Sequence, residues 1–256
     1  MKNILLFLLF LIPFSFNSYA TIEIDITEGN REPLPIAITN FFHDGNEKIT
    51  NTDLSSKIRG VIQNDLESTG LFNSIDEKAF IQENKSLHLK PRFADWRLIN
   101  SQGLVTGDLK IEDDRLKVEF RLWDTLAEKE IEGLVLITTP DNWRRISHMI
   151  ADKIYERLTG EEGYFDTRIV YVAEEGPKNN RIKKLAIMDQ DGANHKFLTS
   201  GKELVLTPRF NPVRQEITYL SYFKNLPRVY LLNIQTGIQE VVGDFPGMTF
   251  APRFSP

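Results

Sequence analysis

The side chains that most often carry out catalysis or bind metal ions lie far apart along this chain. His43, His88, His148 and His195 fall in different predicted elements and show none of the close spacings of a zinc site. His148 and Asp152 are four residues apart on a predicted helix, but such pairs are common on solvated helix surfaces. We therefore expect no metal site and a solvent-exposed His148.

A second set of possible metal ligands is the run Asp189-Gln190-Asp191-Gly192, which resembles the start of a calcium-binding loop. The glutamate and the helices that complete such a loop are missing from the pattern, so a hairpin turn is favoured. No Gly-x-Ser-x-Gly, His-Glu-x-x-His or phosphate-binding glycine-rich pattern occurs. We expect a protein without catalytic residues, metal or cofactor.

The segment best suited to binding another molecule runs from Thr21 to Gly29 and alternates apolar with polar side chains. Its residues are Thr21, Ile22, Glu23, Ile24, Asp25, Ile26, Thr27, Glu28 and Gly29. This period of two predicts a half-buried strand. The strand can be an edge strand of its own domain, or it can add to the sheet edge of a partner. The residues alone favour the first interpretation and leave the second open.

The first twenty residues have the pattern of an export signal. A short basic start precedes the apolar run Ile4 to Ile12, and Ser18 and Ala20 offer the small side chains that signal peptidase accepts. The run is shorter than a membrane-spanning helix needs. We predict a signal peptide over residues 1–20, cleavage after Ala20, and a mature protein outside the cytoplasm.

The composition narrows the class of partner. The chain has 256 residues, of which 41% are hydrophobic and 26% charged, and its net charge is −5. Because no stretch concentrates Lys and Arg with interleaved aromatic residues, we expect no nucleic-acid binding. The absence of cysteine from the sequence excludes disulfides and thiolate chemistry. A protein partner is the better expectation.

Residues 21–162 combine the patterns of strands and helices. Beyond the segment at Thr21, strands are expected at Pro35–Phe42, Leu104–Ile111, Arg115–Trp123 and Lys129–Thr139, the last three as an antiparallel meander. These elements predict an α+β domain, in which helices cover one face of a mixed sheet.

Two amphipathic helices belong to the same region. The first runs from Asn51 to Thr69 and ends at Gly70. Asp141 is expected to cap the second helix and Gly160 to end it. Its apolar face carries Trp143, Ile146, Ile150, Ile154 and Leu158.

Residues 163–256 repeat themselves. Pro208-Arg209-Phe210-Asn211-Pro212 recurs 44 residues later as Pro252-Arg253-Phe254-Ser255-Pro256. Residues 169–172 and 185–192 likewise match residues 217–220 and 230–237. A period near 44 without helical segments is typical of a four-stranded propeller blade. We predict about two blades and, because a closed ring needs at least about four, a truncated chain.

The chain resembles the TolB family in three places. They are the end of the first helix, the junction between the two regions and the blade motif: residues 66–72 (LESTGLF), 158–172 (LTGEEGYFDTRIVYV) and 252–256 (PRFSP). The resemblance implies a periplasmic, non-catalytic protein of the Tol-Pal system, which links the inner and outer membranes and supports envelope integrity and constriction. It also implies an α/β domain over residues 21–162 and about two of six blades over 163–256.

The resemblance further implies two protein partners and no cofactor. The inner-membrane-anchored protein TolA would bind the segment Thr21 to Gly29. The lipoprotein Pal would bind the mouth of the propeller channel, mostly on blades beyond this chain. One departure from the family pattern is Asn211-Pro212-Val213-Arg214, which replaces Ser-Pro-Asp-Gly and is expected to alter that hairpin.

Two other functions remain open from the sequence. The blades can belong to a secreted prolyl-oligopeptidase-like hydrolase whose catalytic domain lies further along, in which case a Gly-x-Ser-x-Gly elbow would follow the propeller. They can also bind a small ligand in a propeller channel.

Overall fold

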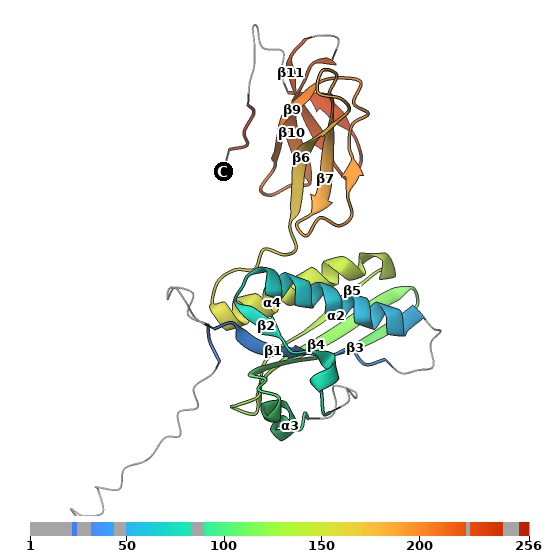
Figure 1. Cartoon of the computed structure of the whole chain (residues 1–256). Coiled ribbons are helices and arrows are strands. Elements are labelled where there is room, and N and C mark those ends of the chain that lie inside the picture. The colour runs from blue at the N-terminus through green and yellow to red at the C-terminus, as the bar shows by residue number, and fades with distance from the viewer. Residues whose placement is uncertain are drawn as a thin grey trace, which may run out of the picture. The chain divides into compact units, whose positions relative to one another are not determined.

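The computed structural model describes residues 22–24, 32–43, 50–82, 90–223, 226–242 and 251–255. The predicted signal peptide, residues 1–20, lies outside the described residues. The chain divides into two compact units, residues 1–163 and 164–256, which are coloured from blue to yellow and from yellow-orange to red in Figure 1.

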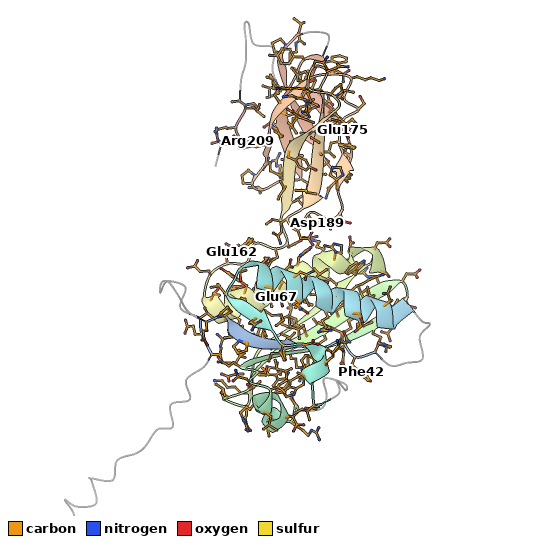
Figure 2. All side chains as sticks on the ribbon, in the orientation of Figure 1. Phe42, Glu67, Glu162, Glu175, Asp189 and Arg209 are labelled. Atoms are coloured by element: carbon orange, nitrogen blue, oxygen red, sulfur yellow. The ribbon has the colours of Figure 1, made fainter. Side chains whose placement is uncertain are left out.

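A mixed sheet of five strands forms the centre of the described part of the first unit, in the order β2-β1-β3-β4-β5. β1 pairs in parallel with β2 and β3, whereas β3, β4 and β5 form an antiparallel meander, as predicted. The strands are β1 (Leu34–Ile38), β2 (Phe72–Ser74), β3 (Gly103–Glu112), β4 (Arg115–Asp124) and β5 (Lys129–Thr138). β1 stops before the predicted end of its strand, and Phe42 (Figure 2) forms only a single bridge to Asp108.

Helices α2 (Thr50–Ser68) and α4 (Trp143–Thr159) pack against each other and cover one face of this sheet (Figure 1). Their apolar stripes are buried, as the spacing predicts: Ile58, Val61, Ile62 and Leu66 on α2, and Ile146, Ile150, Ile154 and Leu158 on α4. Gly70 and Gly160 follow these helices with φ of 72° and 76°. Glycine adopts this left-handed conformation at low cost, which is why both helices end there.

The opposite face of the sheet is covered in part by a short helix that the sequence pattern did not predict. Helix α3 (Phe93–Leu98) follows the 3-10 turn η2 (Glu77–Ala79) in the chain and lies on the other side of the sheet from α2 and α4 (Figure 1). Its Phe93 and Trp96 form a buried cluster with Ala37, Leu104 and Trp123. With only six residues, α3 is too short to show a helical period.

The structure corrects the prediction that Asp141 caps α4. Pro140–Asn142 forms a 3-10 turn, η3, in which the Asn142 N–H donates to the Thr139 carbonyl at 3.0 Å. Asp141 lies inside this turn, so α4 begins only at Trp143 and Asp141 does not cap it. The physical reason is that proline fixes the φ angle suited to the first position of a helical turn.

The second unit contains two antiparallel sheets in its described residues. β6 (Arg168–Glu175), β7 (Ile182–Asp189) and β8 (Lys196–Phe197) form the first. β9 (Val205–Phe210), β10 (Glu216–Ser221), β11 (Arg228–Asn233) and β12 (Gln239–Val241) form the second. Leu185 of the first sheet shares one buried cluster with Val205, Ile217, Tyr219, Tyr230 and Leu232 of the second. The second sheet has four antiparallel strands, the number predicted for one propeller blade.

The internal repeat corresponds to the same hairpin in both sheets. The repeated runs at 169–172 and 217–220 lie in β6 and β10, and those at 185–192 and 230–237 cover β7 and β11 with the turns that follow. Arg209, labelled in Figure 2, belongs to the blade motif and lies on β9. The described residues contain no sheet that closes on itself.

Candidate functional site

The start of the alternating segment is held against the first unit by hydrogen bonds from two of its backbone N–H groups. The Ile22 N–H donates to Asp124 Oδ2 at 3.0 Å, and the Ile24 N–H donates to the Leu158 carbonyl at 2.5 Å. The Ile22 side chain is buried, Glu23 is exposed and Ile24 is half-buried. Residues 22–24 belong to no strand, so the strand predicted here is wrong for these three positions.

Asp124 is the last residue of β4, and its side chain organises the turn into β5. Its Oδ1 atom accepts hydrogen bonds from the Leu126 N–H at 2.9 Å and the Ala127 N–H at 2.7 Å. Aspartate favours this position because its short side chain reaches backbone N–H groups two and three residues ahead. With Ile22, the carboxylate accepts three backbone N–H groups, and it is completely buried.

The second contact uses the end of α4. The last carbonyl groups of a helix have no partner within the helix. Here the N–H of Gly160 donates to the Glu156 carbonyl at 2.9 Å, and the N–H of Ile24 satisfies the carbonyl of Leu158. The segment therefore completes a helix terminus.

A groove of about 350 Å³ adjoins the exposed side of the segment. It is lined by Glu23 of the segment, Glu132 of β5, Lys153, Glu156 and Arg157 of α4, and Gly160. Lys153 Nζ lies 2.6 Å from Glu156 Oε2, and this hydrogen bond and charge raise the pKa of Lys153. Arg157 Nε donates to the Ile131 carbonyl at 2.9 Å. The alternating charges make the groove a polar surface.

Only part of the predicted site lies within the described residues. Ile22, Glu23 and Ile24 do, whereas Thr21 and residues 25–29 lie outside them. Sequence reasoning did not identify Asp124 or Leu158. An Asp between a strand and a turn is a signal for hairpin geometry. This signal does not indicate which group donates to the second carboxylate oxygen, because the donor, Ile22, lies 102 residues away in the sequence.

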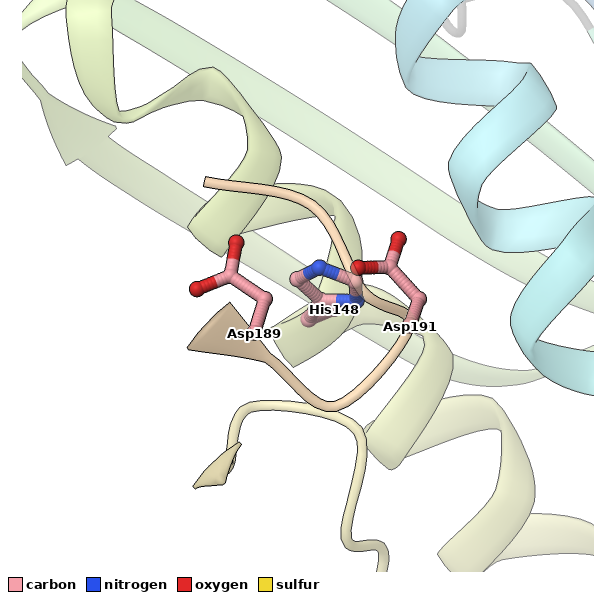
Figure 3. A group of neighbouring side chains, drawn as sticks. All are labelled: His148, Asp189 and Asp191. Atoms are coloured by element: carbon pink, nitrogen blue, oxygen red, sulfur yellow. The ribbon is translucent and has the colours of Figure 1, made fainter. Parts of the chain in front are cut away.

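The histidine considered as a possible metal ligand, His148, is part of the packing between the two long helices. His148 lies on α4 (Figure 3) and is buried, so the predicted solvent exposure is wrong. Its Nδ1 lies 2.6 Å from Oδ2 of the equally buried Asp65 on α2. The spacing of four residues to Asp152 did not reveal this pair, because Asp65 comes from another helix.

The acidic run after β7 forms a hairpin turn, as favoured from its sequence. Asp189 ends β7 and Asp191 lies in the turn (Figure 3). The Gly192 N–H donates to the Asp189 carbonyl at 3.0 Å, and the Asp189 N–H donates to the Ala193 carbonyl at 2.9 Å. Gly192 has a φ of 86°, which explains a glycine at this position.

A search for membrane-spanning helices gave a negative result for the described residues. No helix there has both the length and the apolar character to cross a bilayer.

Comparisons with known proteins agree across both units. The family model of the TolB amino-terminal domain matches residues 22–131, and that of the TolB beta propeller domain matches residues 155–256. The Tol-Pal system protein TolB of Pelagibacter ubique (strain HTCC1062) is 61% identical over 252 residues, which are 96% of this chain and 56% of that protein.

A solved structure has a similar fold. The crystal structure of TolB from Acinetobacter baumannii matches with a TM-score of 0.73 and 28% identity, over 88% of this chain and 53% of that chain. The chain thus spans about half the length of the relatives that it matches.

Proposed function

Because this chain belongs to the TolB family, we propose that it is a non-catalytic, periplasmic scaffold protein of the Tol-Pal system. In this role it binds TolA through residues 21–29, and in a protein with the whole propeller it binds Pal through the channel mouth. The connection maintains the outer membrane and supports constriction during division. The 61% identity to a TolB protein over 96% of the chain favours this role over the hydrolase and ligand-binding alternatives.

The observation that supports the TolA assignment is the small number of contacts that hold residues 22–24. Hydrogen bonds from two backbone N–H groups and one buried isoleucine hold these three residues, outside any sheet ladder. Burying an isoleucine contributes about 1.5 to 3 kcal/mol, the hydrogen bond to the Leu158 carbonyl about 1 kcal/mol, and the hydrogen bond to the Asp124 carboxylate about 1.5 to 3 kcal/mol. A partner can offset a cost of this size, so residues 22–24 can leave without dismantling the sheet.

The pattern of the segment suggests how it would bind once released. Alternating apolar residues suit an added strand, in which backbone hydrogen bonds supply affinity and every second side chain fills a pocket. The docked segment buries Ile22 in its own domain. TolA and the first unit therefore compete for the same apolar side chain.

A peptide of residues 21–29 tests this assignment without contributions from the rest of the chain. We expect a fluorescently labelled peptide to bind purified TolA and to be displaced by the intact chain. An Ile24→Asp peptide should lose binding because it places a charge on the apolar face, whereas a Glu23→Gln peptide should keep it. A peptide that does not bind, or that binds equally well with Asp at position 24, would refute the assignment.

A further inference from the structure

We propose that the outer edge of β5 binds a second copy of this chain, with the two β5 strands antiparallel about a two-fold axis at Val135. β5 is the last strand of the five-stranded sheet, and among the described residues no strand pairs with its outer side. An edge strand of this kind presents backbone N–H and C=O groups that can hydrogen-bond to another chain. The proposal is independent of the proposed function.

The hydrogen bonds between β3 and β4 determine which residues of β5 face outward. Gln102 and Thr125 extend the register of these two strands, and the Thr125 N–H donates to the Gln102 carbonyl at 3.0 Å. Because backbone groups alternate between the two neighbouring strands, odd-numbered residues of β4 bond to β3 and even-numbered ones bond to β5. The even-numbered residues of β4 pair with residues 134, 136 and 138. The outward-facing backbone groups of β5 are therefore those of Gly133, Val135 and Ile137.

Hydrogen bonds within the chain limit this edge at both ends. Arg157 Nε donates to the Ile131 carbonyl at 2.9 Å, and the Asn142 N–H donates to the Thr139 carbonyl at 3.0 Å. We refer to the three outward-facing residues between these points, 133, 135 and 137, as the β5 edge. The first of them donates its N–H to the Glu132 side chain at 3.1 Å, an exposed bond that the carbonyl of a partner strand can replace.

The β5 edge is complementary to itself. In an antiparallel pairing centred on Val135, the backbone groups of Gly133 face those of Ile137 in the other copy, and the groups of Val135 face their own equivalents. All three outward-facing residues then find partners. A shift by two residues would bring in Ile131 or Thr139, whose carbonyl groups already accept hydrogen bonds. The available groups therefore favour an identical strand in a single register.

The side chains of the β5 edge also suit a second copy. Residues 133–138 carry no charge, and Val135 and Ile137 are 45% and 57% exposed. In the centred register Val135 lies beside Val135 of the second copy, and Ile137 of each copy lies diagonally across, so these β-branched side chains can form one apolar cluster. Edge strands that stay unpaired usually carry charged residues or proline.

The charges beyond the apolar run are complementary in the same register. It brings Lys129 of each copy level with Asp141 of the other, in the turn just after β5, so opposite charges approach at both ends of the paired strands. The two glutamates of β5 come level with uncharged residues. Because the arrangement is two-fold, it closes on itself and gives a dimer instead of a growing fibre.

Sedimentation velocity of the full chain at increasing concentration tests the proposal. We expect a dimer with a dissociation constant of roughly 10 µM to 1 mM, because a short strand edge forms a small interface. Val135→Lys and Val135→Glu each place two like charges face to face at the two-fold axis, so each variant should remain monomeric. An equimolar mixture of the two variants should dimerise again, since lysine then faces glutamate.

Two further measurements serve as controls. Leu126→Lys introduces the same charge at another exposed apolar residue and should dimerise like the wild-type chain. Amide exchange of the wild-type chain, measured by NMR, needs no variant to fold. With rising concentration it should slow several-fold at Val135 and Ile137 and stay unchanged in β12, an edge strand of the second unit.

Three results would overturn the proposal. The first is a wild-type chain that stays monomeric up to millimolar concentration. The second is association that persists in Val135→Lys or that slows exchange in β12 instead of the β5 edge, because the contact would then lie on another surface. The third is a mixture of Val135→Lys and Val135→Glu that stays monomeric although the wild-type chain dimerises, because residue 135 would then not face its own equivalent.

Discussion

At the scale of single residues, substitution by alanine should change the free energy of unfolding in opposite directions at Gly107 and Gly60. A Cβ atom at Gly107 on β3 would overlap the ring of the fully buried Phe41, whereas one at Gly60 on α2 would have no atom within 4 Å. We expect Gly107→Ala to lower the free energy of unfolding by about 1 to 3 kcal/mol. Gly60→Ala should raise it by about 0.5 to 1 kcal/mol, because alanine favours the helix. Urea unfolding of both variants checks this, and changes of the same sign would contradict the packing described.

Tyr219 should make the second unit sensitive to alkaline pH. Burial raises the pKa of its phenol to about 12, with the neighbouring Tyr230 adding to the effect. In an unfolded chain the pKa of a tyrosine side chain is about 10. Because the folded state holds the proton to higher pH, the contribution to stability is fully present below about pH 10 and is lost between about pH 10 and 12.

The measurement for Tyr219 is the free energy of unfolding across this range. We expect the free energy of unfolding of Tyr219→Phe to fall less steeply between about pH 10 and 12 than that of the wild-type chain, since phenylalanine cannot ionise. Absorbance of the tyrosinate ion should show one fewer late-titrating group in the variant. Equal slopes for the two chains would show that Tyr219 does not ionise as described.

At the scale of elements, hydrogen bonds of Asn211 close the β9–β10 hairpin. The Asn211 side chain accepts the Val213 and Arg214 N–H groups, and the Asn211 N–H donates to the Glu216 carbonyl at 2.9 Å. We expect Asn211→Ala to destabilise the second unit by about 1 kcal/mol and Asn211→Asp to be nearly neutral. Thermal melts of the two variants test this, and equal losses would show that the side-chain oxygen is unimportant.

Elements with a clear period could be predicted from the sequence. The stripes of α2 and α4, the meander β3–β5 and the repeated hairpins all follow patterns that extend over eight or more residues. Glycines with positive φ marked the ends of both long helices. These features depend mainly on local chemistry, so a single sequence reveals them.

Features that depend on distant residues could not be predicted. The short helix α3 forms because Phe93 and Trp96 pack on the sheet, and the burial of His148 depends on Asp65 of another helix. The docking site of the segment combines the end of β4 with the end of α4, through Asp124 and Leu158. No local sequence pattern predicts these contacts, because each contact forms only after the sheet and helices have assembled.

At the scale of the whole molecule, residues 22–24 lie at the margin of the core of the first unit. The sheet, α2 and α4 form a core whose buried apolar residues lie within the first unit. Of residues 22–24, only Ile22 has a buried side chain. The proposed function, in which the segment moves from its own domain to a partner, requires this division, since release of the segment must leave the domain folded.

The measurement that tests the central claim most directly is TolA binding by two chains, one beginning at Thr21 and one lacking residues 21–27. Thermal melts of both chains establish that the domain remains folded, and we expect the deletion to lower the melting temperature modestly. Ile24→Asp and Ile26→Asp in the otherwise intact chain serve as single-residue versions of the deletion. The account predicts that TolA binding disappears in the deleted chain while its cooperative melt persists. Unchanged TolA affinity in a folded chain without residues 21–27 would contradict it.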